Sequence, residues 1–537
     1  MNQIISGVIL TAAKADVTIC EVFGELPTGL IPVNGKPIIF YILHQFISNG
    51  ITDVYIGVDY KEEKLKEIVN LYFENKINII YLYTDKNKGP GNSLLTILKN
   101  IKSTGAIVNL GDTYIKDLEF NNLSNQVVIS NDFINEERWA VVETNTKGQI
   151  EAFSEKKKGS HKNLHALTGV YRFNNISAFN DYVEDNEKLQ ISDLLQYYHQ
   201  SVATISTCIT KGWLDFGHID KYYISKKRLI QSRGFNSLEY NDLLGTITKK
   251  SKNVEKFRAE IRWQLDLPKN IKVLAPRVLD YSIGDNPFIK MEFYSYPTLA
   301  EIWLFSELNE NIYFSIIDKL FKVMELFRQN KQNVSLLDYQ NMYIDKTKQR
   351  LSSITNNTIL ELLTLDKIII NGKQYDNWNI LEEQAFDKIT NLFIENDNCF
   401  IHGDFCLSNI LYDLRSGITR LIDPRGIWGS NENGDIKYDV AKLRHSVCGD
   451  YDYIVNDLFQ INVMDNEVKY SIYNSNKYSV KEYFDNQVSK YYDLNHIKLI
   501  EGLLFLSMIS LHDDNPKRQL VMYAKSIKLL NEVHENI

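Results

Sequence analysis

The stretch Ile401–Gly426, IHGDFCLSNILYDLRSGITRLIDPRG, places two acids and an amide in a mostly apolar frame. Asp404 is followed five residues later by Asn409, and Asp423 lies fourteen residues beyond that. Phosphoryl transfer from ATP requires a carboxylate to orient or deprotonate the acceptor hydroxyl, and oxygen ligands to hold Mg²⁺ against the phosphates. If ILY and ITRLID pair as strands joined by the turn DLRSG, Asp423 returns to the side of Asn409. The spacing therefore predicts a phosphoryl-transfer site.

The same stretch contains a short motif with recognisable spacing. His402, Gly403, Asp404 and Asn409 form H-G-D-x-x-x-x-N, and Asp423 closes a later I-D pair. This arrangement resembles the aminoglycoside phosphotransferase and choline kinase superfamily. The resemblance implies that Asp404 is catalytic, that Asn409 and Asp423 bind Mg²⁺, and that ATP is the phosphoryl donor. His402 is expected to be a structural hydrogen bonder.

The resemblance extends to both sides of this motif. It implies that Lys249 ends a strand and holds ATP phosphates, with Glu260 on the next helix as its ion-pair partner. Lys250 remains an alternative, because neighbouring strand residues face opposite sides and the register is open. MEFYS, which contains Glu292, is similar to the hinge strand that borders the adenine, and Asp439 begins a helix in a structural role.

Acceptor recognition is less well defined by the sequence. Arg425 directly follows the Asp423–Pro424 pair, so it could contact a phosphate or an anionic acceptor. A surface salt bridge is an equally good interpretation of this arginine. Specificity is expected to lie in a pocket shaped by helical insertions such as residues 358–378, so the acceptor's identity stays open.

The first half alternates short apolar runs with stretches of helical periodicity. The strand-like runs are residues 7–12, 53–58, 77–83 and 105–112, and the helical stretches include 36–50 and 61–75. This alternation predicts a β/α layered domain with a parallel sheet. Ligands of such sheets gather at the carboxyl ends of strands, where Asp112 is placed.

A second set of charged residues fits a different reaction. Attack of a phosphate oxygen on the α-phosphorus of a nucleoside triphosphate needs a divalent cation and a cationic side chain. NLGDTY presents Asp112, FSEKKKG presents Glu155 and Lys156, and GWLDFGHIDKYY presents Asp215. Together these segments predict a nucleotidyl-transfer site over roughly residues 1–230.

The first half resembles the sugar-phosphate nucleotidyltransferases, which make nucleoside-diphosphate sugars. The resemblance implies that Asp112 and Asp215 bind Mg²⁺ and that a second nucleoside triphosphate is a substrate. Its remaining implied contacts are Glu155 and catalytic Lys156 with the sugar phosphate, Thr168 and Gly169 with the sugar, and Gly89 and Gly91 with the base.

The sequence departs from that family in its triphosphate loop. The family has a glycine-rich turn ending in arginine, whereas this chain has LTAAKADVT. Thr28 and Gly29 stand where the family has a lysine before its L-L-P-V segment. Lys14 could supply part of the missing charge as a catalytic residue, or it could be a solvated loop lysine. The altered loop leaves two interpretations: an active transferase, or a degenerate binding module.

Length and composition support a two-domain globular protein. The chain has 537 residues, of which 44% are hydrophobic and 24% charged, with a net charge of −8. The composition changes near Ser232, which predicts domains at 1–231 and 232–537. The expected fold class is α/β. It combines a Rossmann-like, GT-A-like nucleotidyltransferase sheet domain with a two-lobed, protein-kinase-like α+β domain, in which a small sheet lobe joins a larger helical lobe.

The bulk properties also restrict partners and compartment. The acidic balance argues against a nucleic-acid partner. Five scattered cysteines without C-x-x-C pairs suit reduced thiols in a cytoplasm. The N-terminus is unlike a signal peptide, and no later segment is expected to be apolar for the ~18 residues of a membrane span.

The two halves together predict a bifunctional bacterial enzyme. One half would phosphorylate a small sugar, alditol or amino alcohol, and the other would couple the phosphate to a nucleotide. The resemblances imply an activated donor for capsule or surface polysaccharide. The alternatives are a kinase with a degenerate transferase half, a drug-modifying kinase and a nucleotide sensor. The nucleotide base and the oligomeric state stay open.

Overall fold

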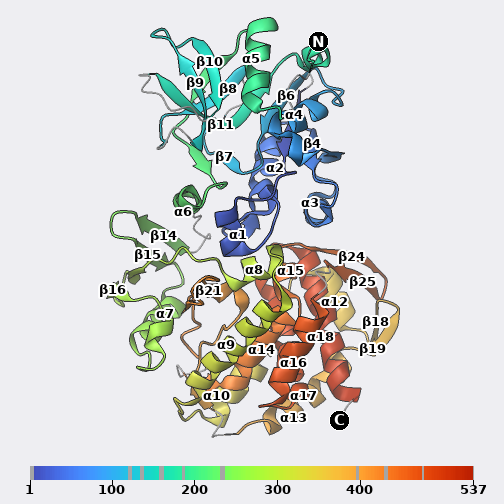
Figure 1. Cartoon of the computed structure of the whole chain (residues 1–537). Helices are drawn as coiled ribbons and strands as arrows, with labels where there is room; N and C mark the ends of the chain where they lie inside the picture. Colours follow the sequence, from blue (N-terminus) through green and yellow to red (C-terminus); the bar gives the residue numbers. More distant parts are fainter. Residues whose placement is uncertain are drawn as a thin grey trace. The chain divides into compact units, whose positions relative to one another are not determined.

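The computed structural model describes residues 5–118, 124–133, 138–155, 163–183, 188–229, 236–394, 398–428, 433–473 and 477–535. The chain folds into two compact units (Figure 1). Unit 1 comprises Met1–Ile230 with Phe305–Glu307, and unit 2 comprises Gln231–Leu304 with Leu308–Ile537. The boundary predicted near Ser232 falls outside the described residues, and the two functional domains stay a prediction.

A mixed sheet of nine strands forms the core of unit 1. Its parallel part has the order β6 (Gly105–Asn109), β1 (Ile5–Leu10), β4 (Asp53–Val58) and β5 (Asn78–Tyr83). The sequence predicted these four strands. The sequence did not predict the antiparallel extension of this sheet. The extension runs from β6 through β11 (Leu164–Phe173) and β9 (Ala140–Thr144) to β10 (Ile150–Glu155). β8 (Gln126–Ser130) also pairs with β11, and β12 (Ser206–Ile209) pairs with β8.

Helices cover this sheet through apolar faces at helical spacing. In α2 (Ile38–Ser48), Ile38, Ile42 and Phe46 are at most 1% exposed. The helix approaches β1 closely, because a Cβ added to Gly7 would lie 2.6 Å from Cδ2 of Phe46. α3 (Glu63–Phe73) and α4 (Pro90–Leu98) bury similar faces. This packing fixes the parallel strands, whose carboxyl ends lead to the candidate acids.

Unit 2 contains a small antiparallel sheet and a set of helices. The sheet has the order β14 (Asn236–Asn241), β15 (Thr246–Ser251), β17 (Phe288–Glu292) and β16 (Val278–Ser282). Phe257 and Ile261 of α7 (Val254–Leu265) pack on Ile289 of this sheet. The main helices are α9 (Glu310–Arg328), α14 (Ile436–Val447), α16 (Tyr478–Ser489), α17 (Leu494–Met508) and α18 (Pro516–Glu535).

The insertion at 358–378 differs from the helical structure that the sequence predicted. It begins within α12 (Asn357–Leu363) but continues as the hairpin β18 (Lys367–Ile370) and β19 (Lys373–Asp376). The turn has Asn371 at φ +49° and Gly372 at φ +81°, which suits the tight turn that Asn-Gly favours. β18 also pairs with β25 (Glu467–Ile472), which pairs with β24 (Phe459–Met464). In the second part of the insertion, the β18–β19 hairpin of a four-stranded sheet therefore takes the place of the expected helix.

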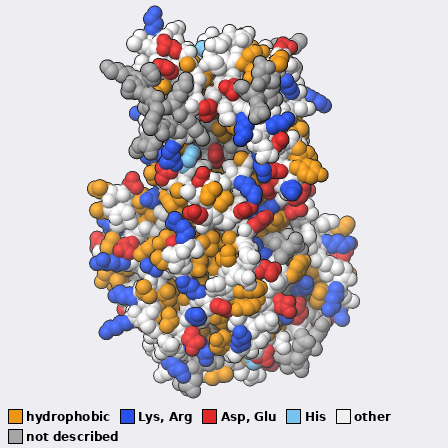
Figure 2. Space-filling model, in the orientation of Figure 1, with side chains coloured by type: hydrophobic (Ala, Val, Ile, Leu, Met, Phe, Trp, Pro, Cys, Tyr) orange, Lys and Arg blue, Asp and Glu red, His pale blue; other side chains and the backbone are white. Residues whose placement is uncertain are grey.

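The surface carries charges of both signs. Figure 2 shows acidic and basic side chains interspersed on the face in view, among hydrophobic side chains. The formal charges are 60 Lys and Arg against 68 Asp and Glu. The described residues on this face therefore present no extended field of a single sign.

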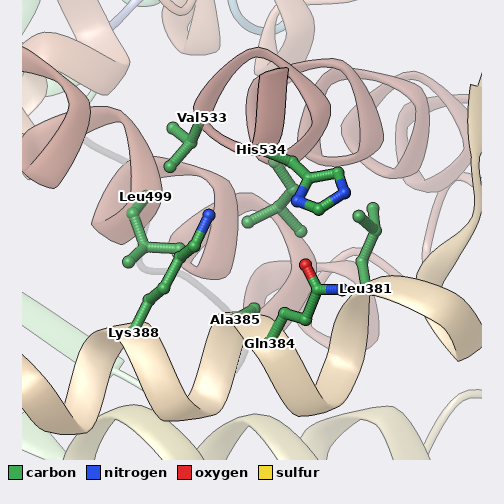
Figure 3. A pocket seen from close by; sticks show the side chains of 8 residues that line it. Leu381, Gln384, Ala385, Lys388, Leu499, Val533 and His534 are labelled. Carbon is green, nitrogen blue, oxygen red and sulfur yellow. The ribbon is translucent and has the colours of Figure 1, made fainter. Parts of the chain in front are cut away.

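Segment Leu494–Leu511, which contains α17, has the length and mean hydropathy of a membrane span, contrary to the expectation from the sequence. However, 67% of it is buried within the protein, where α17 packs on α14 and α18. α17, α18 and α13 (Trp378–Asn391) also line a small hollow (Figure 3). This hollow contains none of the predicted site residues.

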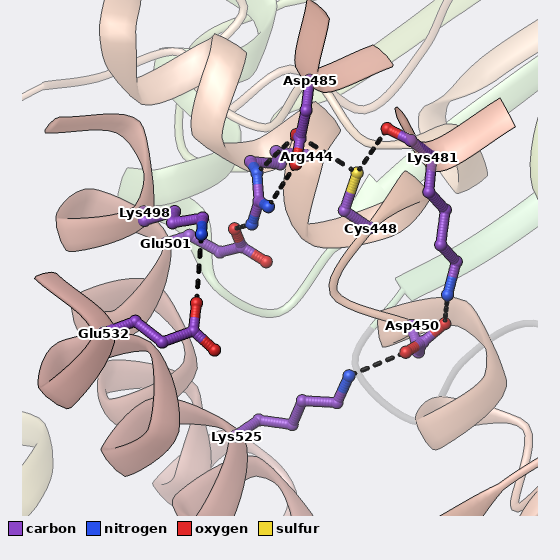
Figure 4. Close-up of polar contacts among 9 residues, drawn as sticks. All are labelled: Arg444, Cys448, Asp450, Lys481, Asp485, Lys498, Glu501, Lys525 and Glu532. Carbon is purple, nitrogen blue, oxygen red and sulfur yellow. Dashed lines mark hydrogen bonds and ion pairs between the residues drawn. The ribbon is translucent and has the colours of Figure 1, made fainter. Parts of the chain in front are cut away.

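Buried ion pairs hold α14 against its neighbours (Figure 4). Arg444 donates from Nε and Nη2 to the two carboxylate oxygens of Asp485 on α16, at 2.9 and 2.8 Å. Its Nη1 pairs with Glu501 on α17, whose side chain is fully buried. Because removing one partner of a buried pair leaves an uncompensated charge, Arg444 is expected to be important for stability.

We predict that Arg444→Met lowers the free energy of unfolding of unit 2 by about 3–5 kcal/mol. Lys498→Met is the matched control, because Lys498 pairs at 3.1 Å with the more exposed Glu532 and should cost less than about 1 kcal/mol. Hydrogen exchange of the α14 and α17 amides in the full chain measures both effects. Equal protection in the two variants would contradict a structural role for the Arg444 pairs.

Candidate active sites

In unit 2, Lys249 is the lysine at the centre of an ion-pair cluster. Its Nζ lies 2.6 Å from Oε1 of Glu260 and 2.8 Å from Oδ1 of Asp423. Although burial opposes the charge, these two acids hold the pKa of Lys249 above its ordinary value. Lys250, the alternative from the sequence, is exposed. The register of β15 thus directs Lys249 toward the acids.

Asp404 lies between an amide and a second lysine. Nδ2 of Asn409 donates to Oδ2 and to the backbone oxygen of Asp404, both at 3.0 Å. Nζ of Lys442 on α14 lies 2.8 Å from Oδ1. Burial opposes ionisation, but Lys442 outweighs it and lowers the pKa of Asp404 to about 2. Asp404 is therefore an ionised hydrogen-bond acceptor, better suited to orienting a hydroxyl than to deprotonating it fully.

The backbone before Asp404 is fixed by Asp439 at the start of α14. Its two carboxylate oxygens accept from the backbone amides of His402 at 2.7 Å and Gly403 at 2.9 Å. The His402 ring is buried against the aromatic rings of Trp263 and Phe405. Burial lowers the pKa of His402 to about 4, so the ring is neutral at pH 7. Asp439 thus holds the backbone, as the sequence predicted, whereas neither ring nitrogen of His402 has a hydrogen-bond partner among the described residues, so His402 is a packing residue and not the expected hydrogen bonder.

Asn409 and Asp423 flank the two strands of a hairpin. β21 (Ile410–Tyr412) pairs antiparallel with β22 (Thr419–Leu421), as the sequence predicted, and the Ile422 amide donates to the Asn409 carbonyl at 3.0 Å. Asp423 has φ +53°. One Asp423 oxygen bonds Lys249, and among the described residues its second oxygen and Oδ1 of Asn409 have no protein partner. These free oxygens fit a hard cation such as Mg²⁺.

The two remaining candidates of unit 2 are Arg425 and Glu292, which make local hydrogen bonds. The backbone amide of Arg425 donates to the His402 carbonyl at 3.0 Å, and its Nε donates to the Ile427 carbonyl at 2.9 Å. Glu292 ends β17 and accepts from the hydroxyl of Tyr294 at 3.0 Å. Arg425 is thus next to the Asp404 turn, while Glu292 is at the expected hinge strand.

In unit 1, two acids converge from segments distant in the sequence. Asp112 follows β6, and Asp215 ends β13 (Trp213–Asp215), which pairs with β7 (Thr113–Ile115). A Cβ added to Gly217 would lie 2.5 Å from Oδ2 of Asp112 and 3.5 Å from Oδ1 of Asp215. Both carboxylates therefore face one point, which the absent side chain of Gly217 leaves open.

The electrostatics at this point favour a cation. Burial first, and then the charge of Asp215, raise the pKa of Asp112 to about 7. Two adjacent carboxylates are hard oxygen ligands whose repulsion a divalent cation relieves, so this donor set fits Mg²⁺. Across the described ranges, no three His, Cys, Asp or Glu side chains group as a complete metal site.

Sequence reasoning missed His218 beside this pair. Its Nδ1 lies 2.9 Å from Oδ2 of Asp215, and its ring packs on Trp139 with centroids 4.7 Å apart. The hydrogen bond with Asp215 raises the pKa of His218. His218 precedes α6 (Ile219–Arg228) as its N-cap residue, so its position three residues after Asp215 was the available signal.

The glycines predicted to contact ligands have packing roles in the structure. A Cβ on Gly89 or Gly91 would meet the carbonyl oxygen of Leu189 at 2.5 Å or that of Gln190 at 2.4 Å. Gly169 has φ +86°, and its carbonyl accepts from the Leu110 amide at 3.1 Å, two residues before Asp112. Gly89 and Gly91 thus pack against residues 189–190, and Gly169 lies beside the segment that leads to Asp112; the predicted base and sugar contacts stay untested.

Of the other candidate residues of unit 1, Glu155, Thr168 and Lys14 are described by the structure and Lys156 is not. Glu155 ends β10; burial first, and then the charges of Glu155 and Asp112, raise the pKa of Tyr171. Thr168 is buried and donates to the Val128 carbonyl at 2.9 Å. Lys156 lies outside the described residues. Nζ of Lys14 pairs with Glu25, and this pair is exposed.

Comparison with known proteins supports the interpretation of the first half. Residues 24–232 match the family model described as nucleotidyl transferase. Residues 24–232 are thus similar to the nucleotidyl transferase family. A D-glycero-alpha-D-manno-heptose 1-phosphate guanylyltransferase of Campylobacter jejuni is 24% identical over 213 residues, covering 38% of this chain and 90% of that protein. The UTP–glucose-1-phosphate uridylyltransferase AglF of Haloferax volcanii is 25% identical over 237 residues, covering 41% and 95%.

Two further relatives align with a similar share of this chain. The bifunctional protein GlmU of Methanococcus maripaludis is 26% identical over 218 residues, which are 39% of this chain. The alignment spans 51%, or about half, of that relative's length. A putative glucose-1-phosphate thymidylyltransferase structure from Bacillus anthracis aligns with a TM-score of 0.38 and 21% identity, covering 43% of this chain and 97% of that one.

Proposed function

We propose that unit 2 phosphorylates a hydroxyl of a small sugar, alditol or amino alcohol with ATP, and that the transferase domain couples the product to a nucleotide. The observation that carries the kinase assignment is Lys249 between Glu260 and Asp423, in the same unit as the Asp404–Asn409 pair. Lys249 supplies a fixed cation, Asn409 and Asp423 supply free oxygen ligands for a metal, and Asp404 supplies an ionised carboxylate that can accept a hydrogen bond from the substrate hydroxyl.

In the proposed kinase step, each residue has one role. Asp404 accepts a hydrogen bond from the acceptor hydroxyl and directs its oxygen toward the γ-phosphorus. Lys249, steadied by Glu260, neutralises phosphate charge. Mg²⁺, which Asn409 and Asp423 would hold, supplies further neutralisation of the phosphates when bound. The hydroxyl oxygen forms the new bond to the γ-phosphorus as the bond from that phosphorus to the β,γ-bridging oxygen breaks; ADP leaves, and the hydroxyl proton passes by way of Asp404 to solvent.

In the proposed transferase step, an oxygen of the sugar phosphate attacks the α-phosphorus and pyrophosphate leaves. Asp112 and Asp215 would hold Mg²⁺, which supplies charge neutralisation at the reacting phosphates when bound. Glu155 and Lys156 are assigned to the sugar and its phosphate, and Thr168 and Gly169 to the sugar site. Gly89 and Gly91 are assigned to the loop near the base.

The second candidate function keeps the kinase but makes the transferase domain a binding module. The observation that favours it is the pairing of Lys14 with Glu25 in the altered triphosphate loop. A paired lysine offers less charge to a triphosphate than the arginine that the loop lacks. Losing such a cation can lower a rate by about 10²–10³-fold.

The experiment combines the full chain with ATP, Mg²⁺ and a panel of sugars, alditols and amino alcohols, and measures ADP. CTP, UTP, GTP or dTTP is then added, and pyrophosphate is measured. We expect pyrophosphate only in mixtures that first formed ADP and product. ADP without pyrophosphate would favour the binding module, and no acceptor-dependent ADP would contradict the kinase. A positive result would support a cytoplasmic source of activated donors for capsule or surface polysaccharide.

A further inference from the structure

We infer that the acceptor of unit 2 is an anionic alcohol, whose carboxylate or phosphate group is bound by Lys346, Arg350 and Arg425 beside Asp404. This inference rests on the proposed kinase function and narrows its substrate class. It is carried by a cluster of cationic side chains from separate segments of unit 2. An anion at this cluster would leave a hydroxyl of the same molecule free to reach Asp404.

Two of these cations lie one turn apart on α11 (Lys346–Ser352), so they share a helix face. Nζ of Lys346 donates to the hydroxyl of Tyr438 at 2.9 Å and lies over its ring. Tyr438 immediately precedes Asp439, which holds the backbone of the Asp404 turn. Nη1 of Arg350 donates to the Ser507 carbonyl at 3.0 Å. These contacts fix Lys346 beside Tyr438 and Arg350 beside Ser507 on α17.

Arg425 approaches the same turn from the other side. A Cβ added to Gly403 would lie 2.8 Å from Cβ and 3.3 Å from Cδ of Arg425. The aliphatic part of the arginine therefore lies against the residue before Asp404. Positive φ at Gly403, +74°, and its lack of a side chain permit this contact. Arg425 thus packs against the turn that contains the proposed catalytic carboxylate, and its Nε donates to the Ile427 carbonyl at 2.9 Å.

The cluster has more basic side chains than carboxylate partners. Within the described part of the chain, Lys346, Arg350 and Arg425 form no ion pair with a carboxylate. Asp404 is already paired with Lys442. Lys346 and Arg350 each interact electrostatically with Arg425 and Asp404, and burial followed by this repulsion lowers the pKa of both cations.

Charge complementarity decides which acceptors fit. Partly buried cations without carboxylate partners are costly, and a bound anion would remove that cost. A choline-like or aminoglycoside-like acceptor would instead need carboxylates at this place. The cluster therefore favours a hydroxy acid or a phosphorylated alcohol over a cationic drug. Carboxylate and phosphate share the required chemistry, so the acceptors tested must distinguish them.

The test uses the full chain with ATP and Mg²⁺ and three-carbon acceptors that differ in charge. Glycerate provides a carboxylate, glycerol 3-phosphate a phosphate, glycerol no charge, and 3-aminopropane-1,2-diol a cation. A second set presents gluconate, sorbitol 6-phosphate, sorbitol and glucamine. We expect ADP formation with at least one anionic member at a kcat/KM ten or more times that of its neutral and cationic counterparts. A neutral or cationic acceptor as the best substrate overturns the inference.

Variants then test whether the cluster is responsible. Arg350→Gln and Lys346→Gln are each expected to raise KM for the preferred anion by about 10- to 100-fold, with KM for ATP unchanged. Lys348→Gln is the matched control, because Lys348 is exposed on the same helix and packs over Phe386. Equal KM values in all three variants would overturn the inference.

The failure of the inference differs from that of the proposed function. If an alcohol of another charge is phosphorylated and Asp404→Asn stops the reaction, the kinase stands and the anionic acceptor is wrong. If no alcohol of any charge supports ADP formation that depends on Asp404, the kinase assignment is wrong and the inference falls with it.

Discussion

Replacing Asp404 by Asn is expected to lower acceptor-dependent ADP formation by about 10²–10⁴-fold, the usual contribution of a positioned acid or base. The side chain keeps its shape but loses the charge that orients the acceptor hydroxyl. It also loses its ion pair with Lys442, which holds Oδ1 at 2.8 Å in the native protein. Initial rates at saturating ATP and acceptor measure the loss. Pyrophosphate release from a preformed sugar phosphate should stay within about twofold of native, because that reaction uses none of these residues.

Two controls separate chemistry from folding. Asp387→Asn makes the same change at an exposed position on α13 and should alter neither rate. Circular dichroism and thermal unfolding of Asp404→Asn should show a folded protein, since the backbone around the turn is held by Asp439 rather than by Asp404. A folded Asp404→Asn variant that kept more than a third of the native ADP rate would exclude the assigned role.

The parts of each site that are local in sequence could be predicted. Asp112 follows a strand of five buried residues, and such strand ends meet at one edge of a sheet. The return of Asp423 to Asn409 followed from a short hairpin whose turn residues are visible in DLRSG. In both cases a few neighbouring residues determine the geometry, so the pattern was sufficient.

The parts that depend on tertiary packing could not be predicted. Nothing near Lys442 or Lys346 in the sequence indicates proximity to Asp404, because packing of α14 and α11 brings them there. The hairpin at 367–376 is a different case. Asn371–Gly372 is a strong turn signal, but the apolar residues before it suggested a continuous helix. The Asn-Gly turn, and not the apolar spacing before it, determines the structure of this segment.

Replacing Asp112 by Asn is expected to lower pyrophosphate formation by about 10²–10³-fold or more, with acceptor-dependent ADP formation unchanged. The variant removes one of the two carboxylates that face the space beside Gly217, and with it a charged oxygen ligand for a divalent cation. Pyrophosphate release with a preformed sugar phosphate and the preferred nucleoside triphosphate measures the change. Chelation of divalent cations should abolish the native rate and have little further effect on the variant.

The stability of this variant distinguishes loss of function from loss of structure. In the native protein burial and Asp215 both disfavour the charge on Asp112, so a neutral side chain at this position relieves repulsion. Without divalent cations, the Tm of unit 1 in Asp112→Asn should therefore equal or exceed that of the native protein. Asp53→Asn, at the partly exposed start of β4, should leave pyrophosphate formation unchanged. A destabilised Asp112→Asn variant would instead mean that the carboxylate makes a structural contact, and its lost activity could not be assigned to a metal ligand.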